Sequence, residues 1–234
     1  MATLSPNHCA RISKSPVTVE EMHDLGIIPR DGPVSFASTK QIRDRLSLYW
    51  GDVTTVDGIS AVVNAAHSSL AQGSGICAAI FDKAGSTALR NELRRFNVPV
   101  DAGTAVTTSG HRLKANHIIH AVGPDFRIPS IELSQHYVAL FNCYTNILEE
   151  CYEHEITSVA IPPISIGIFK GDKDKCADTA VRAVVRFLLR EENRDLDISV
   201  RFVVWEPKSP RDISTQQRLL QPYLNAFGTY TPRL

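Results

Sequence analysis

Short apolar runs rich in β-branched residues alternate along this chain with longer segments whose apolar residues recur at helical spacing. Each run is short enough to be a buried strand. We expect strands at Leu46–Trp50, Ile59–Val63, Thr104–Thr107, His117–Val122, Ser158–Ile161 and Ile198–Trp205. Strands that alternate with helices are typical of a layered α/β fold with a largely parallel central sheet.

The segments between the expected strands contain amphipathic patterns. One apolar stripe at helical spacing consists of Phe141, Tyr144, Ile147, Leu148 and Cys151. A second consists of Val181, Val184, Val185, Leu188 and Leu189. A third apolar segment, residues 76–84, stops at Gly85, where a glycine that ends a helix belongs. We expect a helix at each of the three places.

The first forty-five residues lack this alternation. We assign residues 1–45 to an N-terminal extension with short helices and residues 46–234 to the main domain. Residues 1 to about 16 are polar, and we expect a flexible lead there. Two capping patterns predict the short helices: Thr18 with Glu21, and Ser38 with Gln41. The extension should pack against the edge of the main domain, and a role as a lid or a partner-docking segment is the alternative.

Polar and aromatic residues follow the ends of several expected strands. Asp52, Asn64, Pro124, Ser165 and Trp205 each fall at or just after such an end. In α/β sheets, ligands bind beyond the carboxyl ends of the strands. The sequence therefore predicts a ligand site where these residues meet.

A glycine-rich loop, residues 72–75, lies between an expected strand and an expected helix. This order directs backbone N–H groups and the positive end of a helix toward one place, which suits a phosphate. The loop has no Walker lysine and no complete G-x-G-x-x-G pattern, so neither a P-loop nor a Rossmann fingerprint fits.

Four stretches in order resemble the motifs of the macro domain family, whose members bind ADP-ribose. They contain GDVT, VNAAH and GSGI in residues 51–76, GTAVTT in 103–108, IIHAVGP in 118–124 and IPPISIGIF in 161–169. The corresponding family patterns are GDIT, VNAAN and GGGV, GxAxxT, IIHxVGP and FPAISTGIF. The resemblance covers roughly Leu46 to Tyr223. It implies a three-layer α/β/α fold with a mixed, largely parallel sheet.

The resemblance also implies a set of substrate-binding residues. In it, Asp52 accepts a hydrogen bond from adenine, two loops hold the diphosphate, Phe169 packs on the distal ribose and Trp205 on adenine. The set is Asp52, Val53, Gly73, Ser74, Gly75, Ile76, Cys77, Ser165, Ile166, Gly167, Ile168, Phe169 and Trp205. The alternatives are that Asp52 forms an Asx-turn with Thr54 and that Trp205 covers the core.

Asn64 and His67 are the residues that the resemblance assigns to catalysis. His67 stands where the hydrolytic members have a second Asn, and Cys77 stands where they often have Asp. A histidine can replace an amide as a hydrogen-bond partner or act as a base, and it can also be a surface residue without a catalytic part. We therefore expect an ADP-ribosyl hydrolase, with a non-catalytic reader of ADP-ribosylated partners and an interaction module with a closed pocket as the alternatives.

Composition narrows the class of protein further. The 25 basic and 25 acidic residues cancel, which does not favour nucleic acid as a partner. The 5 cysteines lack CxxC spacing, so we expect neither disulfides nor zinc, and a cytoplasmic or nuclear location. No apolar run approaches a membrane span. We expect a monomer without cofactor or metal that binds ADP-ribose or an ADP-ribosylated protein.

Overall fold

The computed structural model describes residues 4–28, 40–193, 195–204 and 213–231. Its centre is a seven-stranded sheet with the order β1-β2-β7-β6-β3-β5-β4. The strands are β1 (Val17–Thr18), β2 (Leu46–Trp50), β3 (Ala61–Ala66), β4 (Ala105–Ser109), β5 (His117–Val122), β6 (Ser158–Ile161) and β7 (Ser199–Val204). The β1–β2 and β4–β5 pairs at the two edges are antiparallel and the inner pairs are parallel. The expected mixed, largely parallel sheet is confirmed.

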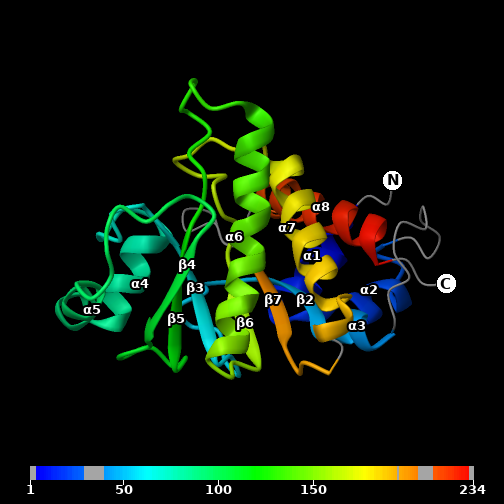
Figure 1. Ribbon diagram of the computed structural model, residues 1–234. Coiled ribbons are helices and arrows are strands. Elements are labelled where there is room, and N and C mark those ends of the chain that lie inside the picture. The colour runs from blue at the N-terminus through cyan, green and yellow to red at the C-terminus, as the bar shows by residue number, and fades with distance from the viewer. Residues whose placement is uncertain (1–3, 29–39, 194, 205–212, 232–234) are drawn as a thin grey trace.

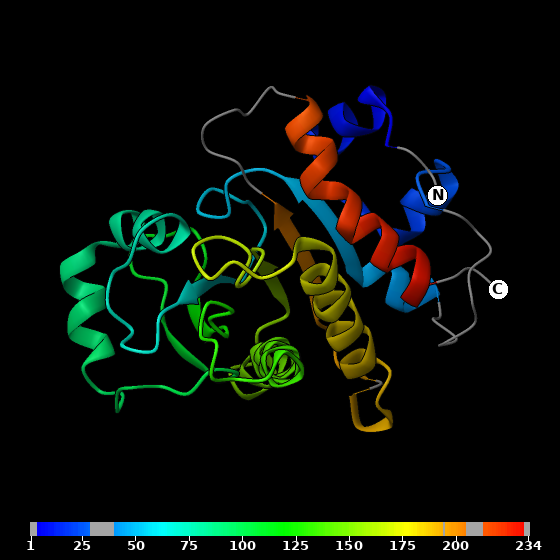
Figure 2. The same cartoon turned by 90° about the horizontal axis from the view of Figure 1, so that it is seen from above.

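Helices cover both faces of the sheet, which makes three layers (Figures 1 and 2). On one face lie α4 (Ile76–Ala84) and α5 (Ser86–Leu93). On the other lie α1 (Pro6–Lys14), α6 (Leu133–Glu153), α7 (Lys173–Leu188) and α8 (Ile213–Tyr230). Shorter helices are α2 (Val19–Asp24), α3 (Lys40–Arg45) and a 3-10 turn (Glu191–Asn193). No helix in the described ranges has the length and apolarity to cross a membrane.

Neighbouring residues of one strand belong to different cores, as the alternation of side chains in a strand requires. In β3, Val62 packs with α4 and α5, whereas Val63 packs with α6 and α7. Ile118 and Ile119 of β5 divide in the same way. Both faces are apolar, so the central strands appear in the sequence as continuous apolar runs.

One strand boundary differs from the expectation. The run expected at Ile59–Val63 is the strand Ala61–Ala66, because all six of its residues pair in register with His117–Val122 of β5. Asn64 therefore lies inside a strand and not at its end, and its side chain is buried with 1% of its surface exposed. The expectation that Asn64 marks a strand end was wrong.

The flexible lead expected in the first sixteen residues was also wrong. Residues 6–14 form α1, whose first residue is Pro6, where no backbone donor is needed. Ser5 caps the helix by accepting a hydrogen bond from the His8 N–H at 3.2 Å. Cys9 and Ile12 are three residues apart and fully buried on one face. Two small apolar side chains thus anchor an otherwise polar segment.

The rest of the first forty-five residues contains the short elements β1, α2 and α3 within the described ranges. Thr18 and Glu21 form the capping box that starts α2, and β1 pairs with β2 at the edge of the sheet. Arg43 of α3 and Glu20 of α2 form a buried ion pair at 2.6 Å. Ser38, the expected start of the next helix, lies outside the described residues, and α3 begins at Lys40.

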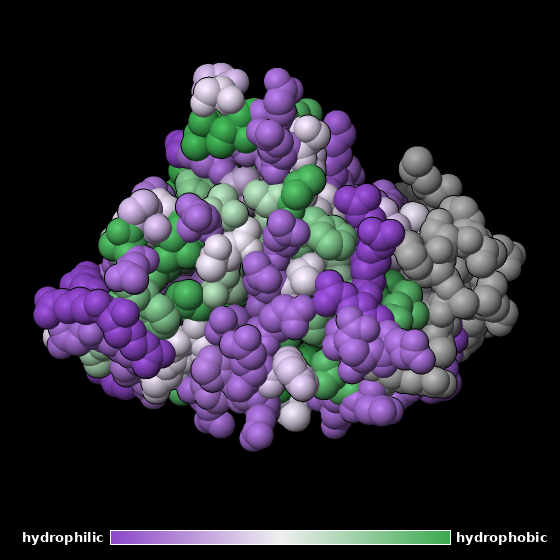
Figure 3. All heavy atoms as spheres, in the orientation of Figure 1, coloured by the Kyte–Doolittle hydropathy of each residue, from purple (hydrophilic) through white to green (hydrophobic). Residues whose placement is uncertain are grey.

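Apolar side chains reach the surface at several places, and three of them lie close together at the start of α6. Ile128 and Ile131, in the chain that leads into α6, and Leu133, the first residue of α6, are each more than a third exposed. The segment that leads into α6 forms the tip at the top of Figure 1, and Figure 3 shows apolar atoms near this tip. The Phe126 N–H donates to the Phe169 oxygen at 3.0 Å, so this tip is tied to the chain that follows β6.

Candidate functional site

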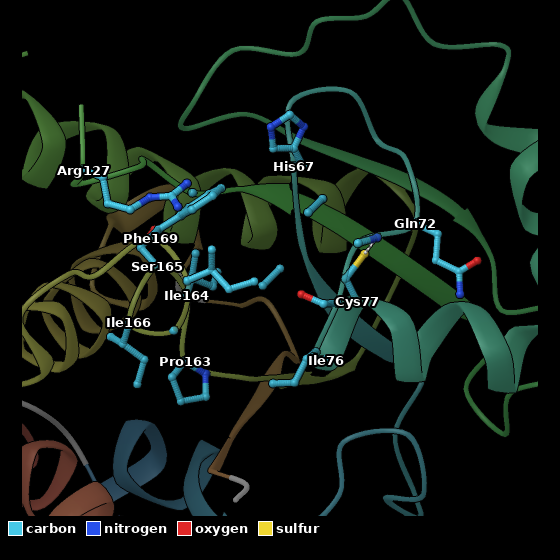
Figure 4. Close-up of a pocket in the computed structure, with 18 of the residues that line it drawn as sticks. His67, Gln72, Ile76, Cys77, Arg127, Pro163, Ile164, Ser165, Ile166 and Phe169 are labelled. Carbon is cyan, nitrogen blue, oxygen red and sulfur yellow. Dashed lines mark hydrogen bonds between the residues drawn. The ribbon is translucent and has the colours of Figure 1, made fainter. Parts of the chain in front are cut away.

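A cavity of about 650 Å³ opens at the carboxyl ends of β3, β6 and β7 (Figure 4). Two loops form its walls: the β3–α4 loop, residues 67–75, and the β6–α7 loop, residues 162–172. Most of the expected site residues line it together: His67, Gly73, Ser74, Gly75, Ile76, Cys77, Ser165, Ile166, Gly167, Ile168 and Phe169. The structure therefore brings these expected residues together around one cavity.

His67 begins the β3–α4 loop and is exposed at the cavity. Its Nδ1 accepts a hydrogen bond from the Ser69 N–H at 3.1 Å and lies 2.8 Å from the Ser69 hydroxyl. A ring nitrogen that accepts from an N–H has no proton, so the proton of the neutral ring is on Nε2. The ring centroids of His67 and Phe169 are 6.5 Å apart. His67 thus offers a donor next to the aromatic ring of the opposite loop.

Cys77 lies in the first turn of α4 and holds the loop in front of it. The Gly73 N–H donates to the Cys77 Sγ at 3.3 Å, and only 6% of the Cys77 surface is exposed. Gly75 has a φ of +61°, a conformation that favours glycine. No side chain caps α4, so the positive end of the helix remains available to a ligand in the cavity.

The β6–α7 loop keeps its shape through its own backbone. The Gly171 N–H donates to the Ser165 oxygen at 2.9 Å, and Ser165 has a φ of +67°. Within the described chain, no acceptor binds the N–H groups of residues 166–168. A Cβ placed on Gly167 would meet no atom within 4 Å, so this residue borders open space. A run of free N–H groups beside a cavity is typical of an anion site.

Three expected site residues do not line this cavity. The Asp52 Oδ1 accepts hydrogen bonds from the N–H and the hydroxyl of Thr54, both at 2.8 Å, which is the Asx-turn geometry. Val53 is buried in the core beside α4, and Asn64 is buried inside β3. Trp205 lies outside the described residues.

Asn64 is held by a chain of buried polar groups. Its Nδ2 donates to the Nδ1 of His120 at 3.1 Å, which places the proton of His120 on Nε2, 2.9 Å from the Thr108 hydroxyl. Burial, with a smaller contribution from the charge of His111, lowers the pKa of His120 to about 3. His120 is thus a neutral core histidine that orients Asn64 from the neighbouring strand.

Two basic residues at the cavity were not found from the sequence. Arg127 binds the Asp125 carboxylate through two hydrogen bonds of 2.8 and 2.6 Å, and its guanidinium carbon lies 5.6 Å from the centroid of the Phe169 ring. Lys173 is the first residue of α7 and also lines the cavity. Neither belongs to a motif, so no sequence signal marks them.

The family model for the Macro domain matches residues 63–180. A macro domain-containing protein of Mesorhizobium japonicum is 37% identical over 141 residues, which cover 60% of this chain and 77% of that protein. The chain belongs to the macro domain family.

One further relative and one solved structure have names or titles that concern ADP-ribose. The Mus musculus protein named ADP-ribose glycohydrolase MACROD1 is 34% identical over 185 residues, or 79% of this chain and 54% of the mouse protein. The chain thus spans about half of that relative's length. The structure of an Oceanobacillus iheyensis macrodomain mutant with ADPR is 28% identical, with a TM-score of 0.64, and the match covers 77% of this chain and 91% of that one.

Proposed function

We propose that this macro domain binds ADP-ribose in the cavity between its two loops and hydrolyses the bond that links the distal ribose to a protein or an acyl group. The observation that carries the proposal is the run of free N–H groups in residues 166–168, because these residues line the same cavity as the uncapped end of α4. Such groups bind the oxygens of a diphosphate without needing a cationic side chain. The names of the relatives agree with this ligand.

A diphosphate between the two loops would place the distal ribose beside His67 and Phe169. In the reaction, a water oxygen bonds to the anomeric carbon, or to the acyl carbon of an ester, while the bond to the leaving group breaks. The water releases a proton to a nearby acceptor such as a phosphate oxygen, and the leaving group gains one. The Nε2–H of His67 is a donor in the neutral ring, so it serves a ribose hydroxyl better than it serves as a base.

The alternative function is a reader that binds ADP-ribosylated proteins without turnover. Cys77 favours the reader function. Hydrolytic members often have an acid at this position, whereas here it holds a buried thiol that accepts a hydrogen bond from the Gly73 N–H. Binding uses the backbone of the two loops, whereas turnover depends more on the side chains at His67 and Cys77. The two functions therefore differ in what these side chains contribute.

One experiment separates the two functions. Mono-ADP-ribosylated protein is incubated with the wild type, with the double variant His67→Asn/Cys77→Asp and with an enzyme-free control, while calorimetry measures ADP-ribose affinity. We expect a micromolar Kd, about −8 kcal/mol, and release of ADP-ribose by the wild type. Binding without release by the wild type assigns the reader function. No detectable binding would remove both functions.

A further inference from the structure

A second cavity, of about 320 Å³, lies at the amino ends of β2 and β7, whereas the first cavity lies at the carboxyl ends of the strands. The residues that matter for its chemistry are Thr18, Asp44, Arg45, Ser47, Ser199 and Arg201. None of them lines the cavity between the two loops, so the two cavities are separate.

The strand register brings the polar residues of this cavity together. Thr18 pairs with Ser47, and Ser47 pairs with Arg201, so these side chains form a row across β1, β2 and β7. Residues paired in register point to the same face of a sheet. Ser199 lies two residues before Arg201 and shares that face. The strand register therefore fixes these residues side by side, whatever the conformations of their side chains.

The guanidinium of Arg201 is only partly satisfied. One of its nitrogens, Nη1, donates to the backbone oxygen of Asp57 at 3.1 Å. The buried Nε has no acceptor among the described residues. Burial lowers the pKa of Arg201, because the charged group has lost much of its water and no carboxylate replaces it. A bound anion would restore the missing interaction.

The other charges around the cavity do not neutralise Arg201. Arg45 is half-buried at the cavity and forms no ion pair within the described ranges. The carboxylate of Asp44, which lines the cavity, is bound to Lys40 at 2.7 Å. The carboxylate of Asp57 is bound to Lys114 at 2.6 Å. Two guanidinium groups thus share one cavity without a carboxylate of their own.

We propose that this second cavity binds a phosphate monoester group. Guanidinium groups bind phosphate oxygens through paired hydrogen bonds. A phosphate has three terminal oxygens, enough for both Arg45 and Arg201 and for the Ser47 hydroxyl, which has no partner in the described chain. A carboxylate has only two oxygens and one negative charge, which makes it the poorer match for two cations. The phosphate belongs to a small phosphate ester or to a phosphorylated side chain of another protein.

The test is an NMR titration of the intact chain with inorganic phosphate, followed at backbone amides. A Gly167→Glu background blocks the first cavity, and chloride at the same ionic strength is the control for screening. We expect saturable shifts at Ser47 and at residues 199–201 with phosphate and none with chloride. Shifts that do not saturate, or that are the same in chloride, would overturn the proposal.

Two variants and a matched control test which groups bind. Arg201→Gln and Arg45→Gln should each weaken phosphate binding by about tenfold or more, because each removes hydrogen bonds to a charged group. Arg94→Gln removes the same charge from the exposed end of α5 and should leave binding unchanged. Arg45 lies outside the sheet, so its variant remains informative if Arg201→Gln does not fold. Unchanged affinity in a folded Arg45→Gln protein would refute the site.

The same titration identifies the source of the phosphate. The probes are inorganic phosphate, O-phosphoserine and a short phosphoserine peptide. Binding of the peptide at least about tenfold tighter than that of phosphoserine assigns a phosphoprotein partner, since the extra ~1.4 kcal/mol must come from contacts beyond the phosphate. Equal affinity of the two assigns a small phosphate ester. Absence of binding by all three probes would contradict the proposal.

Discussion

The two loops that enclose the first cavity are held in place by different parts of the chain. In the β6–α7 loop, the backbone of Ser165 and Gly171 sets the shape and leaves free N–H groups beside the cavity. In the β3–α4 loop, side chains set the shape: the Cys77 thiol binds the Gly73 N–H, and the His67 ring binds Ser69. Gln72 in this loop binds Asp82 at 2.9 Å and accepts a short hydrogen bond from Arg90.

This difference separates binding from turnover. A backbone anion site tolerates changes of side chain as long as the path of the chain and the open space are kept. Where the family has Thr, this chain has Ile166, which removes a hydroxyl but no backbone donor. A reaction that depends on side chains does not tolerate such changes, and the two departures at His67 and Cys77 both lie in the β3–α4 segment. Binding should thus be robust in this chain, whereas its turnover rate should respond to single substitutions.

The strongest prediction concerns the β6–α7 loop. Gly167→Glu should weaken ADP-ribose binding by more than about a hundredfold, or ~2.7 kcal/mol. A glutamate would place a negative charge in the space that the diphosphate needs, while the fold should persist because a Cβ at Gly167 meets no atom within 4 Å. Calorimetry and thermal unfolding measure the two effects. Val138→Glu, at an exposed position on α6, is the charge-matched control. If the variant binds normally, this loop does not hold the diphosphate.

The second prediction concerns His120, which holds Asn64 in the strand that leads into the β3–α4 loop. Burial lowers the pKa of His120 to about 3, so the unfolded chain gains a proton near pH 6.5 while the folded chain stays neutral. Neutral His120 therefore makes its full contribution to the free energy of unfolding above pH 6.5, and this contribution falls as the pH decreases toward 3. The loss in the free energy of unfolding is about 2 kcal/mol between pH 7 and pH 5. Denaturant unfolding at several pH values measures this loss.

His120→Gln should be less stable at pH 7 and show a shallower pH dependence. Equal slopes for both proteins would mean that His120 protonates in the folded state.

The third prediction concerns Asp52, whose carboxylate holds Thr54 in an Asx-turn outside the cavity wall. Asp52→Ala should weaken ADP-ribose binding by about tenfold, ~1.4 kcal/mol, by calorimetry. Thr54→Val is the matched control, since it removes the hydroxyl and keeps the carboxylate. If the carboxylate contacts adenine, Thr54→Val should change affinity by less than about threefold. An equal loss in both variants would mean that Asp52 acts only through the turn.

The smallest expected effect is at His67. His67→Asn should raise kcat by about three- to tenfold, ~0.6–1.4 kcal/mol, with little change in affinity, because an amide offers both a donor and an acceptor to the distal ribose. Single-turnover rates against pH measure it. A slower variant that loses a pH dependence present in the wild type would instead make His67 a base. If neither protein releases ADP-ribose above the enzyme-free rate, the domain is a reader.

The sequence was most informative where a local pattern determines local structure. The strands His117–Val122 and Ser158–Ile161 and the helix that ends at Gly85 match their predicted bounds, because buried apolar runs and a glycine helix stop are local signals. The sequence also pointed to three glycines that line the cavity, Gly73, Gly75 and Gly167, because glycine lets the backbone approach a ligand closely. Site-residue roles implied by the family stay predictions.

What the sequence did not reveal depends on contacts between distant segments. Asn64 lies within β3 because pairing with β5 extends the strand through Ala66. Arg127 reaches the cavity because the Phe126 N–H binds the Phe169 oxygen, a contact across more than forty residues that no local pattern encodes. The helix α1 was missed because its polar composition hides two buried side chains, Cys9 and Ile12.

The packing of α1 against α8 has a consequence for how the chain folds during synthesis. The Leu4 N–H donates to the Gln221 side chain at 3.4 Å, and the Gln217 side chain donates back to the Leu4 oxygen. The buried His23 Nε2 lies 2.8 Å from the Thr231 oxygen. Because α1 and α2 are synthesised before α8, they complete their packing only after α8 has left the ribosomal exit tunnel. Until then the apolar side chains of Cys9 and Ile12 are only partly buried, and chaperones can bind this exposed apolar surface of the growing chain.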